Sequence, residues 1–238
     1  MSKTGITTVL FDLDGTLLPF VQYEFVKLYF GGLCRKLAPL GFDPDKVVKD
    51  VWGGTGAMIK NDGSRPNAEA FWEYFKAQNP DKPDVRPLCD EFYTNEFDKV
   101  QQCLKYKPDR KPIIEELRAA GYGTVLATNP IFPYCAQLTR INWANLSESD
   151  FSYITSYENS TFSKPNPRYF TELLEKIGRS PHECVMIGNS VAEDILPAQS
   201  LGMETFLVTE FMENPENLDI SEFNKGTLEQ AVEFVKSL

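Results

Sequence analysis

Apolar residues follow two different periods along most of the chain. Continuous apolar runs, rich in β-branched residues, predict buried strands over residues 7–13, 123–128, 151–155, 184–188 and 204–208. Apolar residues at helical spacing lie between the later runs and predict helices over residues 111–120, 134–142, 167–177, 192–201 and 227–238. Strands that alternate with helices pair in parallel through right-handed crossovers. We therefore predict an α/β fold with a doubly wound, Rossmann-like parallel sheet, whose ligands bind outside the carboxyl ends of the strands.

Residues 19–107 break this alternation. They are rich in aromatic side chains, carry no convincing strand pattern, and show helical spacing over residues 23–37, 45–51, 67–78 and 85–101. We interpret this segment as a helical cap inserted after the first strand, so that residues 1–18 and 108–238 form the α/β core. The run Gly53-Gly54-Thr55-Gly56 lacks both a preceding strand and the Gly-Lys-Ser/Thr of nucleotide-binding loops, and we expect a turn between cap helices there.

Charge and cysteine content limit the possible binding partners of the protein and its cellular compartment. The 34 acidic residues outnumber the 24 basic ones, and the net charge of −10 repels phosphate backbones and anionic lipids, so we expect neither nucleic acid nor a membrane as a partner. The five cysteines are odd in number and scattered, which is typical of a reducing compartment. No apolar stretch has the length of a signal-peptide core or a membrane span, so we expect a cytoplasmic protein, either a monomer or a homodimer.

Several hydrolytic chemistries are excluded by the residues that they need. The one histidine, His182, precedes an expected strand, and we interpret it as a surface residue at a helix start. A cysteine phosphatase requires an arginine shortly after its nucleophile, and no cysteine here has one at the right spacing. Ser190 follows a strand, as a serine nucleophile does, but no histidine lies downstream of it. Acid-base chemistry must then fall to carboxylates, lysines or tyrosines.

Polar residues instead gather just after four of the expected strands. They are Asp12, Asp14 and Thr16 after the first, Thr128 and Asn129 after the second, Lys164 beyond the third, and Asn189, Glu193 and Asp194 after the fourth. Parallel strands place all of these residues along one edge of the sheet. Each group alone has a simpler interpretation, as a turn, a helix start, a solvated loop or helix-terminal charges. Their common order and position favour a single site.

Attack on a phosphate requires such a set of groups. A carboxylate about 4 Å from a phosphate dianion meets roughly 8 kcal/mol of repulsion at an effective dielectric of about 20, so cations must cancel it. Lys164 can supply one positive charge, and a divalent cation held by Asp12, Asp194 and the Asp14 carbonyl can supply two more. Thr128 would donate its hydroxyl to a phosphoryl oxygen. We expect Asp14 to act as acid and then as base, with a pKa raised by its neighbouring carboxylate and by poor solvation.

This set of residues resembles the motifs of the haloacid dehalogenase superfamily. The first motif is matched by Asp12-Leu13-Asp14-Gly15-Thr16-Leu17, and the later ones are matched by Thr128, by Lys164, and by Asp194 with Glu193. The inserted helical cap is similar to that of the phosphoglycolate-phosphatase-like branch. Asp14 argues against the dehalogenase branch, which lacks an aspartate at this position.

The resemblance implies a role for each matched residue. Asp12 would be the nucleophile and Asp14 the acid and base. The cofactor would be Mg²⁺, bound by Asp12, Asp14, Asp194 and Asn189. The substrate would be bound by Thr16, Asn129 and Lys164. Many relatives have Gly-Asp where this chain has Gly188-Asn189, and Glu193 would restore the missing charge, so we expect retained activity with weaker binding of the metal.

We therefore expect a Mg²⁺-dependent phosphatase that hydrolyses a small phosphorylated metabolite through an aspartyl-phosphate intermediate. A sugar phosphomutase of the same fold stays open, and so does a catalytically silent protein that binds a phosphorylated ligand, which Asn189 alone suggests. The cap should set specificity by closing over the site. Its candidates for contact with an anionic part of the substrate, each also explained as an ordinary solvated charge, are Lys27, Arg35, Lys60 and Arg65. Ile131 and Phe132 are expected to line the floor of the pocket.

Overall fold

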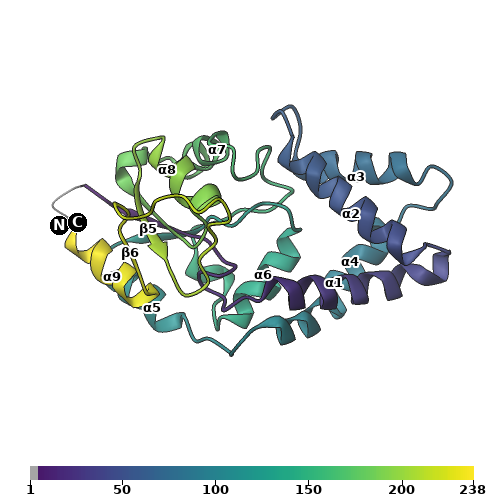
Figure 1. The fold of residues 1–238 in the computed structure, drawn as a ribbon, viewed down its shortest axis with the longest axis horizontal. Helices are drawn as coiled ribbons and strands as arrows, with labels where there is room; N and C mark the ends of the chain where they lie inside the picture. Colours follow the sequence, from purple (N-terminus) through teal and green to yellow (C-terminus); the bar gives the residue numbers. More distant parts are fainter. Residues whose placement is uncertain (1–4) are drawn as a thin grey trace.

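The computed structural model describes residues 5–238, which contain a sheet of six parallel strands (Figure 1). The strands are β1 (Thr8–Phe11), β2 (Gly123–Leu126), β3 (Tyr153–Ile154), β4 (Cys184–Gly188), β5 (Glu204–Val208) and β6 (Lys225–Gly226). Their spatial order is β3-β2-β1-β4-β5-β6. The chain thus builds outward from β1 in one direction and then in the other, which confirms the predicted doubly wound α/β fold.

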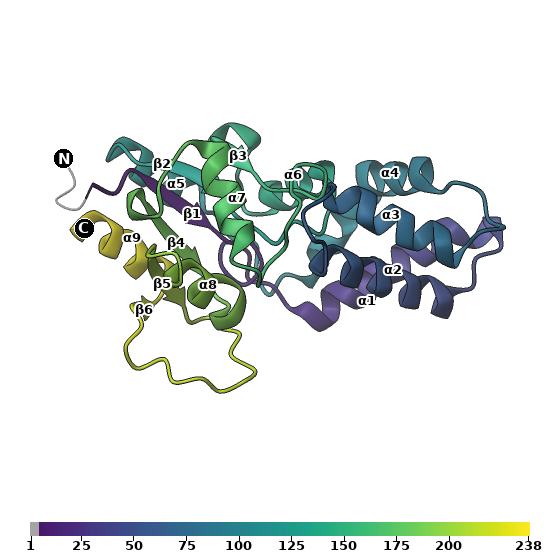
Figure 2. The same cartoon turned by 90° about the horizontal axis from the view of Figure 1, so that it is seen from above.

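Helices cover both faces of the sheet (Figure 2). Apolar residues of α5 (Lys111–Ala119) and α9 (Leu228–Ser237) share a core with Val9 and Phe11 of β1. Residues of α7 (Arg168–Ile177) and α8 (Leu196–Gln199) share a second core with Leu10. Successive side chains of a strand point to opposite faces, so a strand that is covered on both sides needs an unbroken apolar run. This explains why the first strand could be predicted from its sequence.

Four further helices lie beyond the carboxyl end of β1, apart from the sheet (Figures 1 and 2). They are α1 (Gln22–Leu37), α2 (Pro44–Ile59), α3 (Asn67–Gln78) and α4 (Arg86–Asn95), and a 3₁₀ helix, Phe97–Cys103, leads back toward α5 and β2. α6 (Tyr134–Trp143) lies between this helical part and the sheet. None of the helices in residues 5–238 is long and apolar enough to cross a membrane. The division into a core of residues 1–18 and 108–238 and a cap of residues 19–107 stays a prediction, and residues 1–4 lie outside the described part.

The expected turn at residues 53–56 is wrong, because α2 continues through these residues to Ile59. Their glycines serve helix packing instead. A Cβ atom at Gly54 would lie 2.6 Å from Cδ2 of Phe71, and one at Gly53 would overlap the Tyr74 ring. Glycine therefore lets α3 approach α2 closely, and the packing outweighs the modest helix-breaking tendency of the residue.

Some expected elements have different bounds or shapes. The helix expected over residues 192–201 is a π-helical segment, Val191–Ile195, followed by the short α8, in whose first turn Pro197 lies. The helix expected over residues 85–101 is divided into α4 and the 3₁₀ helix. The strand expected over residues 151–155 is shorter in the structure, where it covers only Tyr153–Ile154 (β3). β6 was not expected, because its two residues carry no apolar pattern.

Candidate active site

Asp12 is the first residue after β1 and lies at the carboxyl edge of the sheet. Its backbone N–H donates to the Ile187 carbonyl at 2.9 Å and so extends the pairing with β4. The chain then turns at Gly15, where φ is +79°. A side chain at Gly15 would also overlap the side chain of Asn189. Glycine is required here for both reasons, and it lets the loop after β1 pass against the loop after β4.

Lys164 connects Asp12 to Asp194. Its ammonium is buried and lies 2.9 Å from Oδ1 of Asp12 and 2.5 Å from Oδ1 of Asp194. Burial alone favours the neutral amine, but the two carboxylates raise the pKa of Lys164 above its usual range, so the group stays charged. One cation thus bridges two carboxylates that are distant in the sequence.

Asp194 is held in place by its own segment as well as by Lys164. Its Oδ2 accepts the backbone N–H of Ser190 at 3.0 Å. A Cβ atom at Gly188, the last residue of β4, would overlap the Asp194 carboxylate, so the approach depends on that glycine. Burial raises the pKa of Asp194 to about 7 against the lowering effect of Lys164, and the nearby Asp12 adds to the rise.

Thr16 and Asn189 complete the surroundings of Asp12. The Thr16 hydroxyl lies 3.4 Å from Oδ2 of Asp12 and 3.3 Å from Oδ1 of Asn189, and it can donate to either. The Asn189 amide donates to the Phe211 carbonyl at 2.6 Å, which directs Oδ1 toward Thr16. The structure therefore brings Asp12, Thr16, Lys164, Asn189 and Asp194 into one cluster.

Asp14 is paired with a residue that sequence reasoning missed, Arg140 of α6. The guanidinium of Arg140 forms an ion pair with Oδ2 of Asp14. Oδ1 of Asp14 has no hydrogen-bond partner among the described residues. Burial raises the pKa of Asp14, Arg140 opposes the rise, and the neighbouring Asp12 supports it. Asp14 is thus oriented through one oxygen and leaves the other for a ligand.

Arg140 itself is 1% exposed and has further contacts besides Asp14. Its second amino group donates to Oε1 of Gln137 at 3.0 Å, and its guanidinium lies 5.0 Å from the ring centre of Phe132. Arginine in the last turn of a helix is common at the surface, so its position alone gave no signal. The available signal was that Gln137, Arg140 and the large apolar Trp143 share one face of the expected helix.

Thr128 and Asn129 follow β2 at the same edge. The Thr128 carbonyl accepts hydrogen bonds from the Thr155 hydroxyl at 2.7 Å and from the Tyr169 hydroxyl at 3.0 Å, which fixes this turn. The Asn129 amide donates to Oε2 of Glu193 at 3.1 Å, and its Oδ1 is buried without a partner among the described residues. Burial raises the pKa of Glu193.

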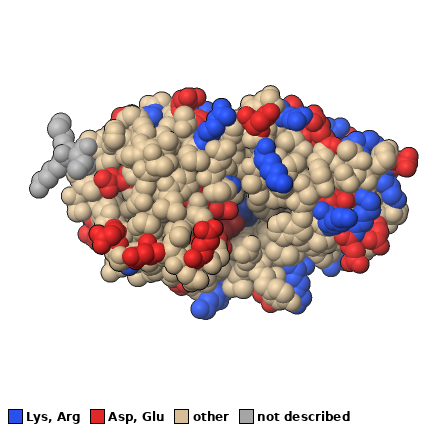
Figure 3. Space-filling view, turned by 45° about the horizontal axis from the view of Figure 1, so that its top comes forward, with Lys and Arg blue, Asp and Glu red and all other residues tan. Residues whose placement is uncertain are grey.

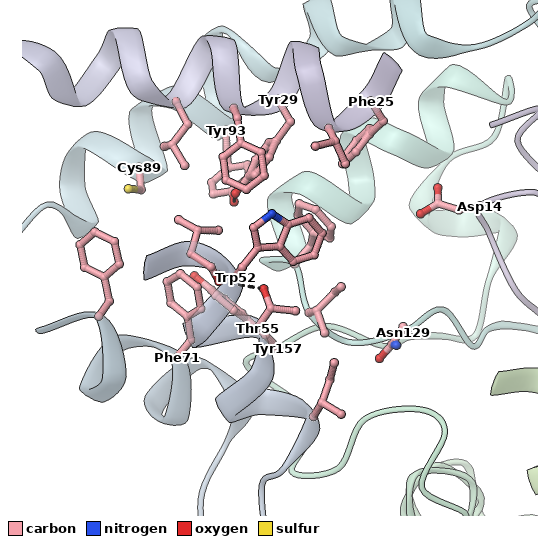
Figure 4. Close-up of a pocket in the computed structure, with 18 of the residues that line it drawn as sticks. Asp14, Phe25, Tyr29, Trp52, Thr55, Phe71, Cys89, Tyr93, Asn129 and Tyr157 are labelled. Atoms are coloured by element: carbon pink, nitrogen blue, oxygen red, sulfur yellow. Dashed lines mark hydrogen bonds between the residues drawn. The ribbon is translucent and has the colours of Figure 1, made fainter. Parts of the chain in front are cut away.

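A cavity of about 260 Å³ runs from this edge into the helical part. Figure 4 shows Asp14 and Asn129 at one end of it, with Tyr29, Tyr93 and Cys89 farther in. Ile131 and Phe132 line the cavity, as expected. On the surface, a hollow with charged side chains at its rim separates the two parts of the molecule (Figure 3).

The four basic cap residues suggested by the sequence lie elsewhere. Lys27, Arg35, Lys60 and Arg65 are all exposed, and none of them lines the cavity. Lys60 and Arg65 border a separate hollow, where Arg65 forms an ion pair with Glu73.

The candidate metal ligands offer oxygen donors. Oxygens of Asp12, Asp194 and Asn189 lie in the cluster around Lys164 and Thr16, and the Asp14 backbone is adjacent. Within residues 5–238, no group of three or more histidine, cysteine, aspartate or glutamate side chains has the geometry to hold a metal ion. The donor set is therefore two carboxylates and an amide oxygen.

The chain is similar to known hydrolases. The family model of haloacid dehalogenase-like hydrolases matches residues 6–202. Ribulose-1,5-bisphosphate 5-phosphatase of Halopiger xanaduensis is 26% identical over 209 residues, covering 84% of each chain. Phosphoglycolate phosphatase of Aquifex aeolicus is 26% identical over 199 residues, covering 84% of this chain and 83% of that protein. A structure of 2-haloacid dehalogenase from Pseudomonas syringae, at 21% identity, shares the fold with a TM-score of 0.62 over 97% of this chain and 98% of that one.

The matched region includes β1 to β4 and the inserted helices α1 to α4, and it ends before β5. Phosphoglycolate phosphatases are among the relatives, as the expected branch requires. These matches confirm the class of enzyme that the sequence predicted, a hydrolase whose relatives are phosphatases. The chain therefore belongs to the haloacid dehalogenase-like hydrolase family.

Proposed function

We propose that this protein is a Mg²⁺-dependent phosphatase that hydrolyses a small phosphorylated metabolite through an aspartyl-phosphate on Asp12. The observation that carries the proposal is the buried ammonium of Lys164, in contact with both Asp12 and Asp194. Asp12 would meet roughly 8 kcal/mol of repulsion from a phosphate dianion about 4 Å away at an effective dielectric of about 20. The Lys164 ammonium, 2.9 Å from Oδ1 of Asp12, lies close enough to reduce that repulsion.

The oxygen donors around Asp12 fit Mg²⁺. This ion is commonly bound through one or two carboxylates together with waters and substrate phosphate, so a cluster of three acidic side chains is not required. Asp12, Asp194 and the side-chain oxygen of Asn189 would hold it, with the Asp14 carbonyl as a further donor. When bound, the ion supplies positive charge that neutralises the phosphoryl oxygens.

In the first half of the reaction, a carboxylate oxygen of Asp12 attacks phosphorus and the bond from phosphorus to the ester oxygen breaks. Asp14 gives its proton to that oxygen, so a neutral alcohol leaves. In the second half, Asp14 takes a proton from a water molecule whose oxygen attacks the same phosphorus. The bond from phosphorus to Asp12 then breaks, and inorganic phosphate leaves.

Three polar residues would position the phosphoryl group during both halves. Thr128 would donate its hydroxyl to a phosphoryl oxygen, and its turn is already fixed by Thr155 and Tyr169. Thr16, which hydrogen-bonds to Asp12, and Asn129, which donates to Glu193, would contact its other oxygens. Such preorganised donors stabilise charge that develops in the transition state.

Release of inorganic phosphate from phosphorylated metabolites with added Mg²⁺ tests the proposal. Asp12→Asn should abolish turnover, and the quenched wild-type enzyme should carry one phosphoryl group on Asp12 by mass spectrometry. Asp81→Asn changes an exposed aspartate of the helical part and serves as the matched control, with full activity expected. Turnover of Asp12→Asn at the wild-type rate would end the assignment of the nucleophile.

The same assay separates the two alternatives left open by the sequence. A sugar phosphomutase would return the phosphoryl group to a hexose phosphate and release little inorganic phosphate. A silent binding protein would release none from any substrate and would not be phosphorylated on Asp12.

A further inference from the structure

The cavity that begins at Asp14 has an unusual lining for a site that handles phosphate. Beyond Asp14, Asn129 and Glu193 at its mouth, the walls come mainly from aromatic and aliphatic side chains of α1, α2 and α3 and of the loop after β2. Trp52 and Phe71 are among them, and Tyr157, which follows β3, also lines the cavity (Figure 4). A ligand bound at Asp14 would therefore extend into apolar surroundings.

Three hydroxyl groups farther into the cavity are already hydrogen-bonded. The hydroxyls of Tyr29 and Tyr93 share a hydrogen bond of 2.8 Å. The Thr55 hydroxyl donates to the Val51 carbonyl of its own helix at 3.0 Å. These side chains thus present mainly their carbon atoms to a ligand, and a polar group placed there would gain few new partners.

Positive charge is absent from the lining. No lysine or arginine of residues 5–238 borders this cavity, and its charged lining residues are Asp14 and Glu193. Arg140 lies close to Phe132, but its amino groups bond to Asp14 and Gln137. A second phosphate or a carboxylate on the leaving group would therefore enter without a free cation and beside two acidic side chains.

We propose that the substrate is a phosphomonoester of an uncharged, apolar alcohol, whose hydrocarbon part occupies this cavity while its phosphate lies at Asp12. This inference rests on the proposed phosphatase function and specifies its leaving group. An apolar cavity of about 150 Å³ accommodates benzene, so the 260 Å³ found here admits a hydrocarbon group somewhat larger than one ring. Anionic leaving groups, such as those of phosphoglycolate and ribulose bisphosphate, fit its lining poorly.

A series of n-alkyl phosphates from ethyl to hexyl tests this inference. The alcohols have similar leaving-group pKa values, so a change in kcat/KM along the series reports burial of the chain. We expect kcat/KM to rise about fourfold per methylene until the cavity is filled. For phosphoglycolate we expect a value about 100-fold below that for hexyl phosphate.

Acetyl phosphate distinguishes failure of this inference from failure of the proposed function, because its leaving group is too small to reach the aromatic walls. Hydrolysis of acetyl phosphate with no dependence on alkyl length would overturn the apolar leaving group and leave the phosphatase standing. Hydrolysis of none of these compounds would overturn both.

Two substitutions test the cavity itself. Thr55→Arg introduces a cation among the apolar walls, and we expect it to abolish the dependence on alkyl length and to raise kcat/KM for phosphoglycolate. Thr94→Arg makes the same change at an exposed threonine of α4 and should behave as wild type. Should Thr55→Arg fail to fold, Trp52→Ala removes part of the wall and should reduce the gain per methylene. If the rise in kcat/KM per methylene is unchanged in Trp52→Ala, or in folded Thr55→Arg, the cavity does not bind the hydrocarbon part of the substrate.

Discussion

At Asp14, burial and Arg140 act in opposite directions on one carboxyl group. Burial raises the pKa of Asp14, the guanidinium lowers it, and burial outweighs the guanidinium. A raised pKa keeps Asp14 protonated to higher pH, as a group that must protonate a departing alkoxide requires. For a substrate with a poor leaving group, kcat should therefore fall as the pH rises through the pKa of Asp14. Asp14→Asn should lower that kcat about 100-fold or more.

Arg140→Gln should move this alkaline fall in kcat to higher pH, because it removes the cation that lowers the pKa of Asp14. The measurement is the pH profile of kcat with ethyl phosphate. Arg140→Lys retains the charge and should keep the fall closer to its wild-type position. With 4-nitrophenyl phosphate, whose leaving group needs no proton, the fall should be weak in every variant. A profile that does not move in folded Arg140→Gln would contradict the role of Arg140.

Asn189→Asp should strengthen Mg²⁺ binding, because it adds a carboxylate beside Asp12. We expect the Mg²⁺ concentration for half-maximal activity to fall roughly tenfold. The same change loses the hydrogen bond to the Phe211 carbonyl, so the metal-free protein should lose about 1 to 2 kcal/mol of unfolding free energy. Asn142→Asp, at an exposed position of α6, is the control and should change neither quantity. An unaltered Mg²⁺ requirement in Asn189→Asp would argue against Asn189 as a ligand.

Among single residues, those that the sequence places beyond the carboxyl ends of the strands were the predictable ones. Asp12, Thr128 and Lys164 could be assigned to one edge because a parallel sheet gathers the ends of its strands there. The partners of these residues were harder to foresee. Arg140 reaches Asp14 only because α6 packs against the loop after β1, and Asn189 bonds to the backbone of Phe211 far along the chain. Such contacts depend on tertiary packing that no local pattern records.

At the scale of elements, the glycine that ends β4 lets the carboxylate of Asp194, a proposed Mg²⁺ ligand, approach the strand closely. Gly188→Ala places a methyl group where the Asp194 carboxylate lies and should displace it by on the order of 1 Å, which lowers kcat about 100-fold. Gly123→Ala in β2 is the matched control, since its nearest neighbour would lie 3.7 Å away, and activity should be retained. Phosphate release and thermal unfolding of both variants provide the comparison. Equal activities would show that Asp194 is not placed by Gly188.

Strands and helices were predictable to the extent that burial determines their pattern. β1 and β4 are covered on both faces and consist of unbroken apolar runs. α3 was expected over the residues that it occupies, because its apolar residues repeat at helical spacing. Gly53 and Gly54 led to the wrong prediction of a turn, because glycine usually marks a turn, whereas here it permits contact between α2 and α3. The decisive neighbours, Phe71 and Tyr74, belong to another helix.

At the scale of the whole molecule, the helical part is anchored beside the candidate active site through Asn67. This side chain is fully buried, and its amide donates to the Ser163 hydroxyl at 3.0 Å and to the Pro130 carbonyl at 3.2 Å. Both partners adjoin proposed active-site residues, Lys164 and Asn129. The break in sequence pattern predicted an inserted helical segment, but it contained no sign of this anchor, because a single asparagine at the start of a helix resembles an ordinary helix cap.

Asn67→Ala should loosen this anchor and test how far the site depends on it. The substitution leaves a buried hydroxyl and carbonyl without their donor, so we expect a loss of about 3 kcal/mol in unfolding free energy. Hydrogen exchange should accelerate at the backbone amide of Ala68, which donates to the Tyr157 carbonyl across the same contact. Asn95→Ala, at the exposed end of α4, should leave both quantities unchanged. Unaltered exchange at Ala68 in Asn67→Ala would mean that the backbone bonds hold the helical part without the side chain, because the amide would then open at its wild-type rate.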